Sequence, residues 1–164
     1  MRRFANLADA GNALAAHVAD DLADAVDAPV VVLAAIPNGV PVALPVCAVL
    51  GVRGQALPVD RSAAGPVIGS LPQLAGCRVV VVDDGVETGS VARAAAVAIR
   101  EQAPAEIVLA VPVCPREAMA DLTRRYDRII ALERPFGRRS LAWHYDDFDT
   151  IDAERAVALL AGQG

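Results

Sequence analysis

Residues 79–90 constrain the fold of this chain more than any other stretch. Four consecutive valines, Val79–Val82, form a short β-branched run of the kind that lies in a buried parallel strand. Two carboxylates, Asp83 and Asp84, follow where that strand should end. A loop rich in glycine and hydroxyl residues, 85–90, then leads into a helical stretch. This order predicts a strand–loop–helix unit of an open α/β sheet.

The same unit predicts a ligand site. In open α/β sheets, ligands bind outside the carboxyl ends of the strands, and loop amides with a helix N-terminus form an anion cradle there. Thr88 and Ser90 add hydroxyl donors to that cradle. Asp83 and Asp84 accept hydrogen bonds only, so they suit sugar hydroxyls rather than a bare phosphate. Together these groups indicate a sugar phosphate, with a solvated pair of acids as the alternative.

The order of apolar segments predicts one three-layer domain over residues 1–164. We expect helices over 7–26, 40–50, 90–100, 116–125 and 152–160, and strands over 29–35, 52–59, 79–82, 106–113 and 128–132. Residues 62–77 read as a loop or at most a short ribbon, and 133–148 as an irregular segment. Alternation of strands and helices is typical of a parallel sheet with helices on both faces.

Composition excludes several classes of function. The net charge is −5 without a basic block, which argues against nucleic-acid binding. No apolar run approaches the roughly 18–20 residues of a membrane span. Met1, Arg2 and Arg3 are not followed by the apolar core of a signal peptide, so we expect a cytoplasmic protein.

The cysteines and the basic residues narrow the chemistry further. Cys47, Cys77 and Cys114 lack metal-ligand or disulfide spacing, and we expect buried thiols and no protein-held metal. All 15 basic residues are arginines, which excludes a Schiff-base or P-loop lysine. The valine run with its two acids also resembles the acidic cluster of a receiver domain. Its mid-chain position and the lack of lysine oppose that alternative.

Residues 79–90 resemble the 5-phosphoribosyl 1-pyrophosphate (PRPP) signature of the type I phosphoribosyltransferases. That signature is four apolar residues, two acids, a few variable residues, then Thr-Gly and a small hydroxyl residue. Weaker similarity to a bacterial group of this family continues at 9–11, 39–41, 111–113 and 145–148. The resemblance implies a three-layer α/β/α fold, with a mainly parallel sheet of about five strands and a small hood.

The resemblance also implies a reaction. It would transfer 5-phosphoribosyl from PRPP to a nucleobase, for instance a 6-oxopurine, with release of pyrophosphate, as in purine salvage. Mg²⁺ would be held mainly by the oxygens of PRPP, and the protein would be a homodimer. A non-catalytic regulatory protein that binds PRPP or a nucleotide is the alternative.

Roles for the signature residues follow from the resemblance. Asp83 and Asp84 would bind the ribose hydroxyls. The loop would hold the 5-phosphate through Gly85, Val86, Glu87, Thr88, Gly89 and Ser90. Glu87 occupies the place of an acid that contacts the base in 6-oxopurine enzymes, where it would act as a general base. A solvated loop acid is the other interpretation of Glu87.

The turn after the first strand would bind pyrophosphate, through Pro37, Asn38 and Gly39 together with Arg61, the second catalytic candidate. The related group has arginine and glycine where this chain has Pro37 and Asn38. We expect Asn38 to preserve the turn, because asparagine tolerates left-handed backbone. The segment 62–77 is shorter than the lid of the family, so we expect either a site open to water or a site that a partner subunit covers.

The aromatic segment 133–148 offers two interpretations. Phe136, Trp143 and Tyr145 would stack on a nucleobase, with an acid at 146 or 147 at its edge, or these rings would simply cap the sheet as core. The sequence does not separate the two.

Overall fold

The computed structural model describes residues 2–24, 26–61 and 64–163. Strands and helices alternate through the middle of the chain, as predicted. In chain order the elements are α1 (Leu7–Asp21), β1 (Val30–Ala35), α2 (Gly39–Leu50), β2 (Gly54–Leu57), β3 (Val59–Asp60), β4 (Val67–Ile68), β5 (Arg78–Val82), α3 (Ser90–Arg100), β6 (Glu106–Val113), α4 (Arg116–Arg125), β7 (Arg128–Glu133), the 3-10 helix η1 (Leu141–His144) and α5 (Ala153–Ala161).

The central sheet has five parallel strands in the order β2-β1-β5-β6-β7. β5 is the middle strand, and Val80 pairs with Val32 on one side and Val108 on the other. Every residue of β5 is buried, which explains its continuous run of valines. A separate antiparallel ribbon joins β3 and β4.

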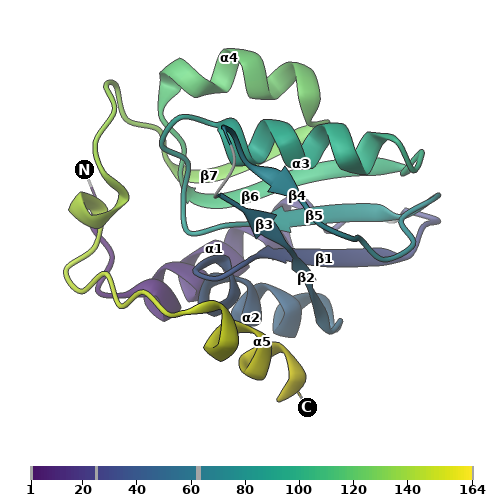
Figure 1. Cartoon of the computed structure of the whole chain (residues 1–164), viewed down its shortest axis with the longest axis horizontal. Coiled ribbons are helices and arrows are strands. Elements are labelled where there is room, and N and C mark those ends of the chain that lie inside the picture. Colours follow the sequence, from purple (N-terminus) through teal and green to yellow (C-terminus); the bar gives the residue numbers. More distant parts are fainter. Residues whose placement is uncertain (1, 25, 62–63, 164) are drawn as a thin grey trace.

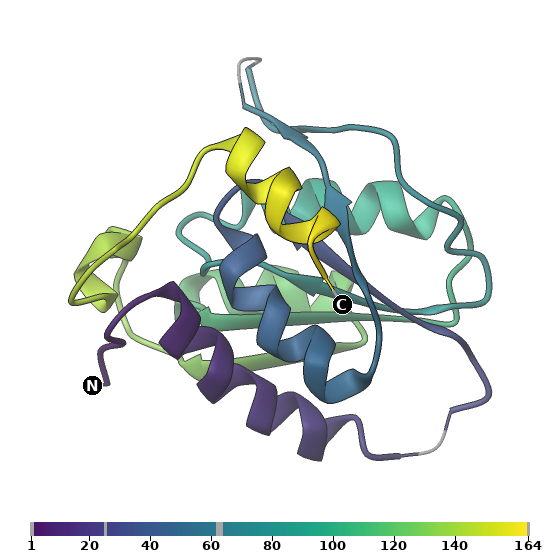
Figure 2. The same cartoon turned by 90° about the horizontal axis from the view of Figure 1, so that it is seen from below.

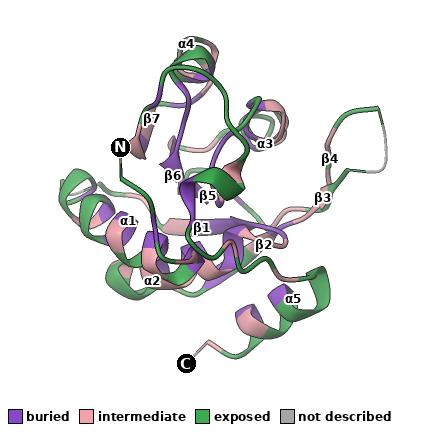
Figure 3. Ribbon diagram, turned by 90° about the vertical axis from the view of Figure 1, so that its left-hand side faces the viewer, coloured by how far each residue is buried: buried purple, intermediate pink, exposed green. Residues whose placement is uncertain are grey.

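Helices cover both faces of the sheet (Figure 1). α3 and α4 pack on one face, where Ile99 and Leu122 share a buried apolar cluster with the sheet. α1, α2 and α5 pack on the other face, which Figure 2 shows from below. Buried residues follow the strands and the inner sides of these helices in Figure 3. The predicted three-layer α/β/α class is confirmed.

Residues 134–152, between β7 and α5, cross the carboxyl ends of the strands and form the small hood. Phe4 forms an isolated bridge with Tyr145, and the backbone N–H of Asp146 donates to Phe4 O at 2.8 Å. The hood then reaches α5, whose N-cap Asp152 accepts from the Arg155 N–H at 2.7 Å. This capping interaction confirms the start of the last helix at the predicted residue.

Three predicted boundaries need correction. The first helix ends at Asp21 rather than at 26, and Asp24 beyond it pairs with Arg78 and Arg128 at the sheet, each at 3.0 Å. Residue 25 lies outside the described residues. The strand expected over 52–59 is divided at Pro58, which has no N–H for the ladder. Within 62–77 the ribbon strand β4 forms, with 62 and 63 outside the described residues.

Two further predictions concern the three cysteines and membrane-spanning segments. Cys47, Cys77 and Cys114 are buried free thiols, as expected, and burial raises the pKa of Cys47 and Cys114 to about 11. Among the helices of the described chain, none combines the length and the apolar character that crossing a membrane requires.

Candidate functional site

A cavity of about 430 Å³ opens at the carboxyl ends of β1 and β5, a volume within the usual range for small-molecule sites. Its polar wall comes from the two loops that the sequence singles out. Its apolar floor comes from the sheet and from the start of α3. The lining residues are Pro37, Asn38, Leu57, Arg61, Val81, Asp83, Asp84, Gly85, Val86, Glu87, Thr88, Gly89, Ser90, Val91, Ala92, Leu109, Leu141 and Phe148.

Gly39 brings the two loops together without lining the cavity. A Cβ atom at this position would stand 2.8 Å from Val82 O and 3.1 Å from the Cα of Asp83, closer than real Cβ atoms come to a backbone oxygen. The start of α2 can therefore approach the end of β5 only with glycine here. The structure assigns Gly39 to the close packing of the two loops, and its contact with pyrophosphate stays a prediction.

Asp83 and Asp84 stand side by side at the end of β5. Asp83 Oδ1 accepts from the Asp84 N–H at 2.8 Å. Burial raises the pKa of both carboxyls, and the adjacent Asp83 charge raises that of Asp84 further. The Arg61 guanidinium acts in the opposite direction on both pKa values. The pair therefore holds a proton readily when the cavity has no bound cation or hydroxyl donors.

The loop after the acid pair is shaped for an anion. Gly85 and Gly89 have positive φ angles of 147° and 88°, which favour glycine. Gly89 is the N-cap of α3 and has no side chain to cap the helix. The Ser90 N–H donates to Thr88 Oγ1 at 3.3 Å, and the next two residues of the helix, Val91 and Ala92, line the cavity at the helix N-terminus, where amides can meet an anion. The Thr88 and Ser90 hydroxyl oxygens lie 2.6 Å apart, and both residues line the cavity.

The opposite wall is the turn between β1 and α2. The Ile36–Pro37 peptide bond is cis, and Asn38 follows with φ −80° and ψ −13°. The expectation of left-handed backbone at Asn38 is wrong, because this residue begins a right-handed helix. Arg61 reaches the same wall, where its Nη1 donates to Ile36 O at 2.9 Å.

Glu87 links the loop to the hood. Its Oε1 accepts from the Leu141 N–H at 2.8 Å, while the side chain remains exposed and lines the cavity. Glu87 is therefore at the predicted place, but one carboxylate oxygen is engaged by backbone. A purely solvated loop acid is not what the structure contains.

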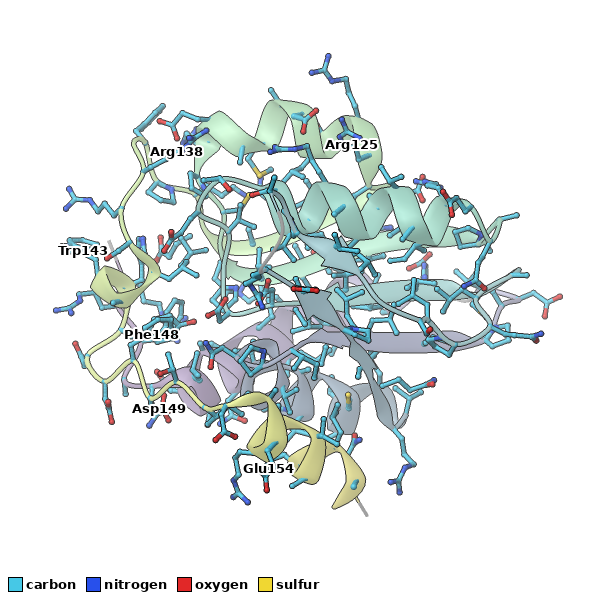
Figure 4. The ribbon with its side chains drawn as sticks, in the orientation of Figure 1. Arg125, Arg138, Trp143, Phe148, Asp149 and Glu154 are labelled. Atoms are coloured by element: carbon cyan, nitrogen blue, oxygen red, sulfur yellow. The ribbon has the colours of Figure 1, made fainter. Side chains whose placement is uncertain are left out.

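The three aromatic residues predicted to stack on a base lie elsewhere. Tyr145 is 2% exposed and its hydroxyl donates to Asp84 O at 2.7 Å, so its ring belongs to the core. Phe136 is 78% exposed beneath Arg116, and Trp143 packs against Arg139 at the outer surface. Figure 4 labels Trp143 pointing away from the sheet. This placement corrects the prediction for all three.

Phe148 and Leu141 line the cavity from the hood instead, and sequence reasoning missed both. The Phe148 ring stacks on Tyr145, with centroids 5.0 Å apart and planes at 25°. The aromatic segment was a sufficient signal to expect a ring here. Which ring faces the cavity depends on side-chain directions in an irregular segment, and periodicity gives no information on those.

Metal ligation by the protein alone has little support in these residues. Within the described ranges, no group of three or more His, Cys, Asp or Glu side chains is arranged to hold a metal ion. The two carboxylates at the end of β5 do supply oxygen ligands, which Mg²⁺ prefers. They fit an ion that arrives with its other ligands already attached.

Comparison with known proteins gives relatives that share part of the chain. No protein-family model matches it. Two proteins from strains of Mycobacterium tuberculosis, each named "Putative phosphoribosyl transferase", are 32% identical over 87 residues, or 53% of this chain. The match spans only 20% of the length of these curated relatives.

Solved structures share the whole fold. TT1426 from Thermus thermophilus superposes with a TM-score of 0.81 at 27% identity over 98% of both chains. APRTase from Giardia lamblia, solved in complex with 9-deazaadenine, gives a TM-score of 0.61 at 16% identity, covering 77% of this chain and 80% of that one. A purine phosphoribosyltransferase from Pyrococcus horikoshii gives 0.56 at 18%, over 87% and 90%. The chain is therefore phosphoribosyltransferase-like, with the fold of the type I phosphoribosyltransferases that residues 79–90 predicted.

Proposed function

We propose that this protein transfers the 5-phosphoribosyl group of PRPP to a ring nitrogen of a nucleobase and releases pyrophosphate. One observation carries the proposal: two adjacent carboxylates lie in a single cavity, between the turn that precedes α2 and the N-terminus of α3. PRPP has vicinal hydroxyls between a phosphate and a diphosphate, which is the matching order of groups. Few other metabolite classes present both anions around one sugar.

Each group of PRPP can be matched to a different set of cavity residues. The 5-phosphate would meet the amides and hydroxyls of loop 85–90, and the ribose hydroxyls would donate to Asp83 and Asp84. The diphosphate would face the turn at Asn38, with Arg61 beside it. Mg²⁺ would enter as part of the substrate, held by diphosphate oxygens and water.

The chemical step breaks the bond between C1 of the ribose and the diphosphate oxygen, and the electron pair leaves with pyrophosphate. The base nitrogen supplies the pair for the new C1–N bond and loses a proton. Positive charge from Arg61 and helix dipoles would stabilise the departing anion. Glu87 lies on the cavity wall and would receive the proton directly or through water.

The acceptor would lie against Leu141 and Phe148. Their apolar surfaces face the cavity beside Glu87, an arrangement suited to a flat ring with a polar edge. A purine, in particular a 6-oxopurine, fits this description. The purine phosphoribosyltransferase among the structural neighbours is in keeping with it.

The test is pyrophosphate release from PRPP and Mg²⁺ with each of the common purine and pyrimidine bases, alongside calorimetric titration of PRPP. The Asp83→Asn/Asp84→Asn double variant should lose saturable PRPP binding and lower turnover by at least 100-fold, since two charge-assisted hydrogen bonds disappear, each contributing about 1.5–3 kcal/mol. Asp27→Asn, at an exposed carboxylate before β1 and so at the opposite end of the sheet, is the control and should match wild type.

Two outcomes would contradict the proposal. Saturable binding without pyrophosphate release on any base would favour a regulatory protein that senses PRPP. Equal binding by wild type and the double variant would mean that the carboxylate pair does not hold the sugar.

A further inference from the structure

The hood rests on the cavity loops through three hydrogen bonds at residues 141, 145 and 151. The Leu141 N–H donates to Glu87 Oε1 at 2.8 Å, and the Tyr145 hydroxyl donates to Asp84 O at 2.7 Å. The third bond runs from the Ile151 N–H to Asn38 Oδ1 at 2.9 Å. Two of these anchors come from the loop after β5, and Asn38 alone among the three comes from the turn after β1.

Asn38 makes this bond at the expense of an ordinary one. It is the N-cap residue of α2, where an asparagine side chain usually accepts from an amide of the first helical turn. Here the side-chain oxygen accepts from Ile151, 113 residues further along the chain. The Asn38 side chain therefore attaches the hood to the turn, while within the helix start the Val40 N–H donates to Pro37 O at 3.3 Å.

Phe148 lies midway between two anchors. Tyr145 precedes it by three residues and stacks against its ring, and Ile151 follows it by three residues. A tight turn between them is closed by the Thr150 N–H, which donates to Phe148 O at 2.8 Å. The Phe148 ring is thus held from the loop after β5 on one side and from the turn after β1 on the other.

We propose that Asn38 is a positioning residue: through Ile151 it fixes the hood so that Phe148 forms the acceptor wall, and it couples that wall to the turn that faces the diphosphate. This inference rests on the proposed function for its substrate names, but the contacts that carry it are present in the ligand-free protein. An anion that orders the turn would also order the hood through this bond.

Two substitutions at Asn38 separate positioning from direct contact with the diphosphate. Asn38→Ala removes the acceptor for the Ile151 N–H. Asn38→Asp keeps a carboxylate oxygen for that N–H but adds negative charge beside the diphosphate. Asn12→Ala, on the exposed side of α1, is the matched control.

The first readouts need no substrate. Trp143, the single tryptophan, lies in the hood, so its fluorescence quenching by acrylamide reports on hood order. Hydrogen exchange at the Ile151 amide reports on the bond itself. Asn38→Ala should speed that exchange about tenfold, the equivalent of one net hydrogen bond, and should raise quenching. Asn38→Asp and Asn12→Ala should behave as wild type.

The kinetic readout then tests the coupling. Asn38→Ala should raise the KM for the acceptor base about five- to tenfold with a smaller change in kcat, and Asn38→Asp should restore it while raising the KM for PRPP. Unchanged Ile151 exchange and Trp143 quenching in Asn38→Ala would overturn the proposal even if no base proves to be a substrate. So would an acceptor KM raised equally in both variants.

Discussion

The two ends of β5 both bury charge, and they treat it in opposite ways. Arg78 begins the strand with a side chain 3% exposed, and its Nη2 lies 3.1 Å from a Glu106 oxygen and 3.0 Å from an Asp24 oxygen. Asp83 and Asp84 follow the strand with like charges adjacent and burial raising both pKa values. One end pairs its charge with opposite charges of the fold, and the other places two like charges side by side, with only the Arg61 guanidinium acting against them.

The difference indicates which end is reserved for a ligand. Arg78 pairs with two carboxylates of the fold, and Arg128 makes a second ion-pair contact to Glu106 at 3.0 Å, so opposite charges meet at this end. The carboxylate pair instead stores an electrostatic cost that hydroxyl donors or a cation would relieve. Unfavourable electrostatics of this kind is characteristic of functional sites, where stability is given up for binding.

Among substitutions at the two ends of β5, we expect the largest change in the free energy of unfolding at Arg78. Arg78→Ala leaves the carboxylates of Glu106 and Asp24 without their buried partner, so we expect the free energy of unfolding to fall by about 3 kcal/mol. Urea denaturation measures the change. Arg100→Ala is the control, because its pair with Asp127 is also 3.0 Å long but 43% exposed, and it should lose less than about 1 kcal/mol. Equal losses would mean that burial of Arg78 is irrelevant.

At the other end the expected effect has the opposite sign. An unfolded Asp84 has the ordinary pKa of about 3.9, and the folded pKa is raised by burial and by Asp83. The folded protein therefore binds more protons, and its stability is full below pH 4 and falls as pH rises toward the folded pKa. Asp84→Asn removes that loss and should stabilise the protein by about 1–2 kcal/mol at pH 8.

Thermal unfolding at pH 4 and pH 8 checks this prediction. The gain from Asp84→Asn should be present at pH 8 and absent at pH 4, with Asp27→Asn neutral at both. A variant that is less stable at pH 8 would show that the carboxylate contributes to the fold, and the contrast between the two ends of β5 would be lost.

Much of this site was accessible from the sequence, because residues 79–90 carry their structure locally. The valines specify the strand, and Gly85 and Gly89 adopt the positive φ angles that their loop requires. Strand order then brings the turn at Asn38 beside the acid pair without further information.

The rest depends on contacts between distant residues. Phe148 faces the cavity because Tyr145 and Ile151 are tied to loops more than 60 residues earlier in the chain, and no local pattern encodes those bonds. The local sequence did not predict that Arg78 is buried in ion pairs, because its partners Asp24 and Glu106 are distant in the chain. Pro58 did carry a local signal, the missing N–H, and it marks where the predicted second strand divides.

The smallest expected effect is the coupling between the two ends. Arg78 and Asp84 are separated by about 20 Å along the strand, and they share no partner. A double-mutant cycle of Arg78→Ala and Asp84→Asn should therefore be additive within about 0.5 kcal/mol. Asp83→Asn with Asp84→Asn should not be, because either substitution alone already removes the like-charge repulsion, so the joint gain falls short of the sum. Additivity within the acid pair, or coupling across the strand, would show that the charges at the two ends are not the independent features that their contacts indicate.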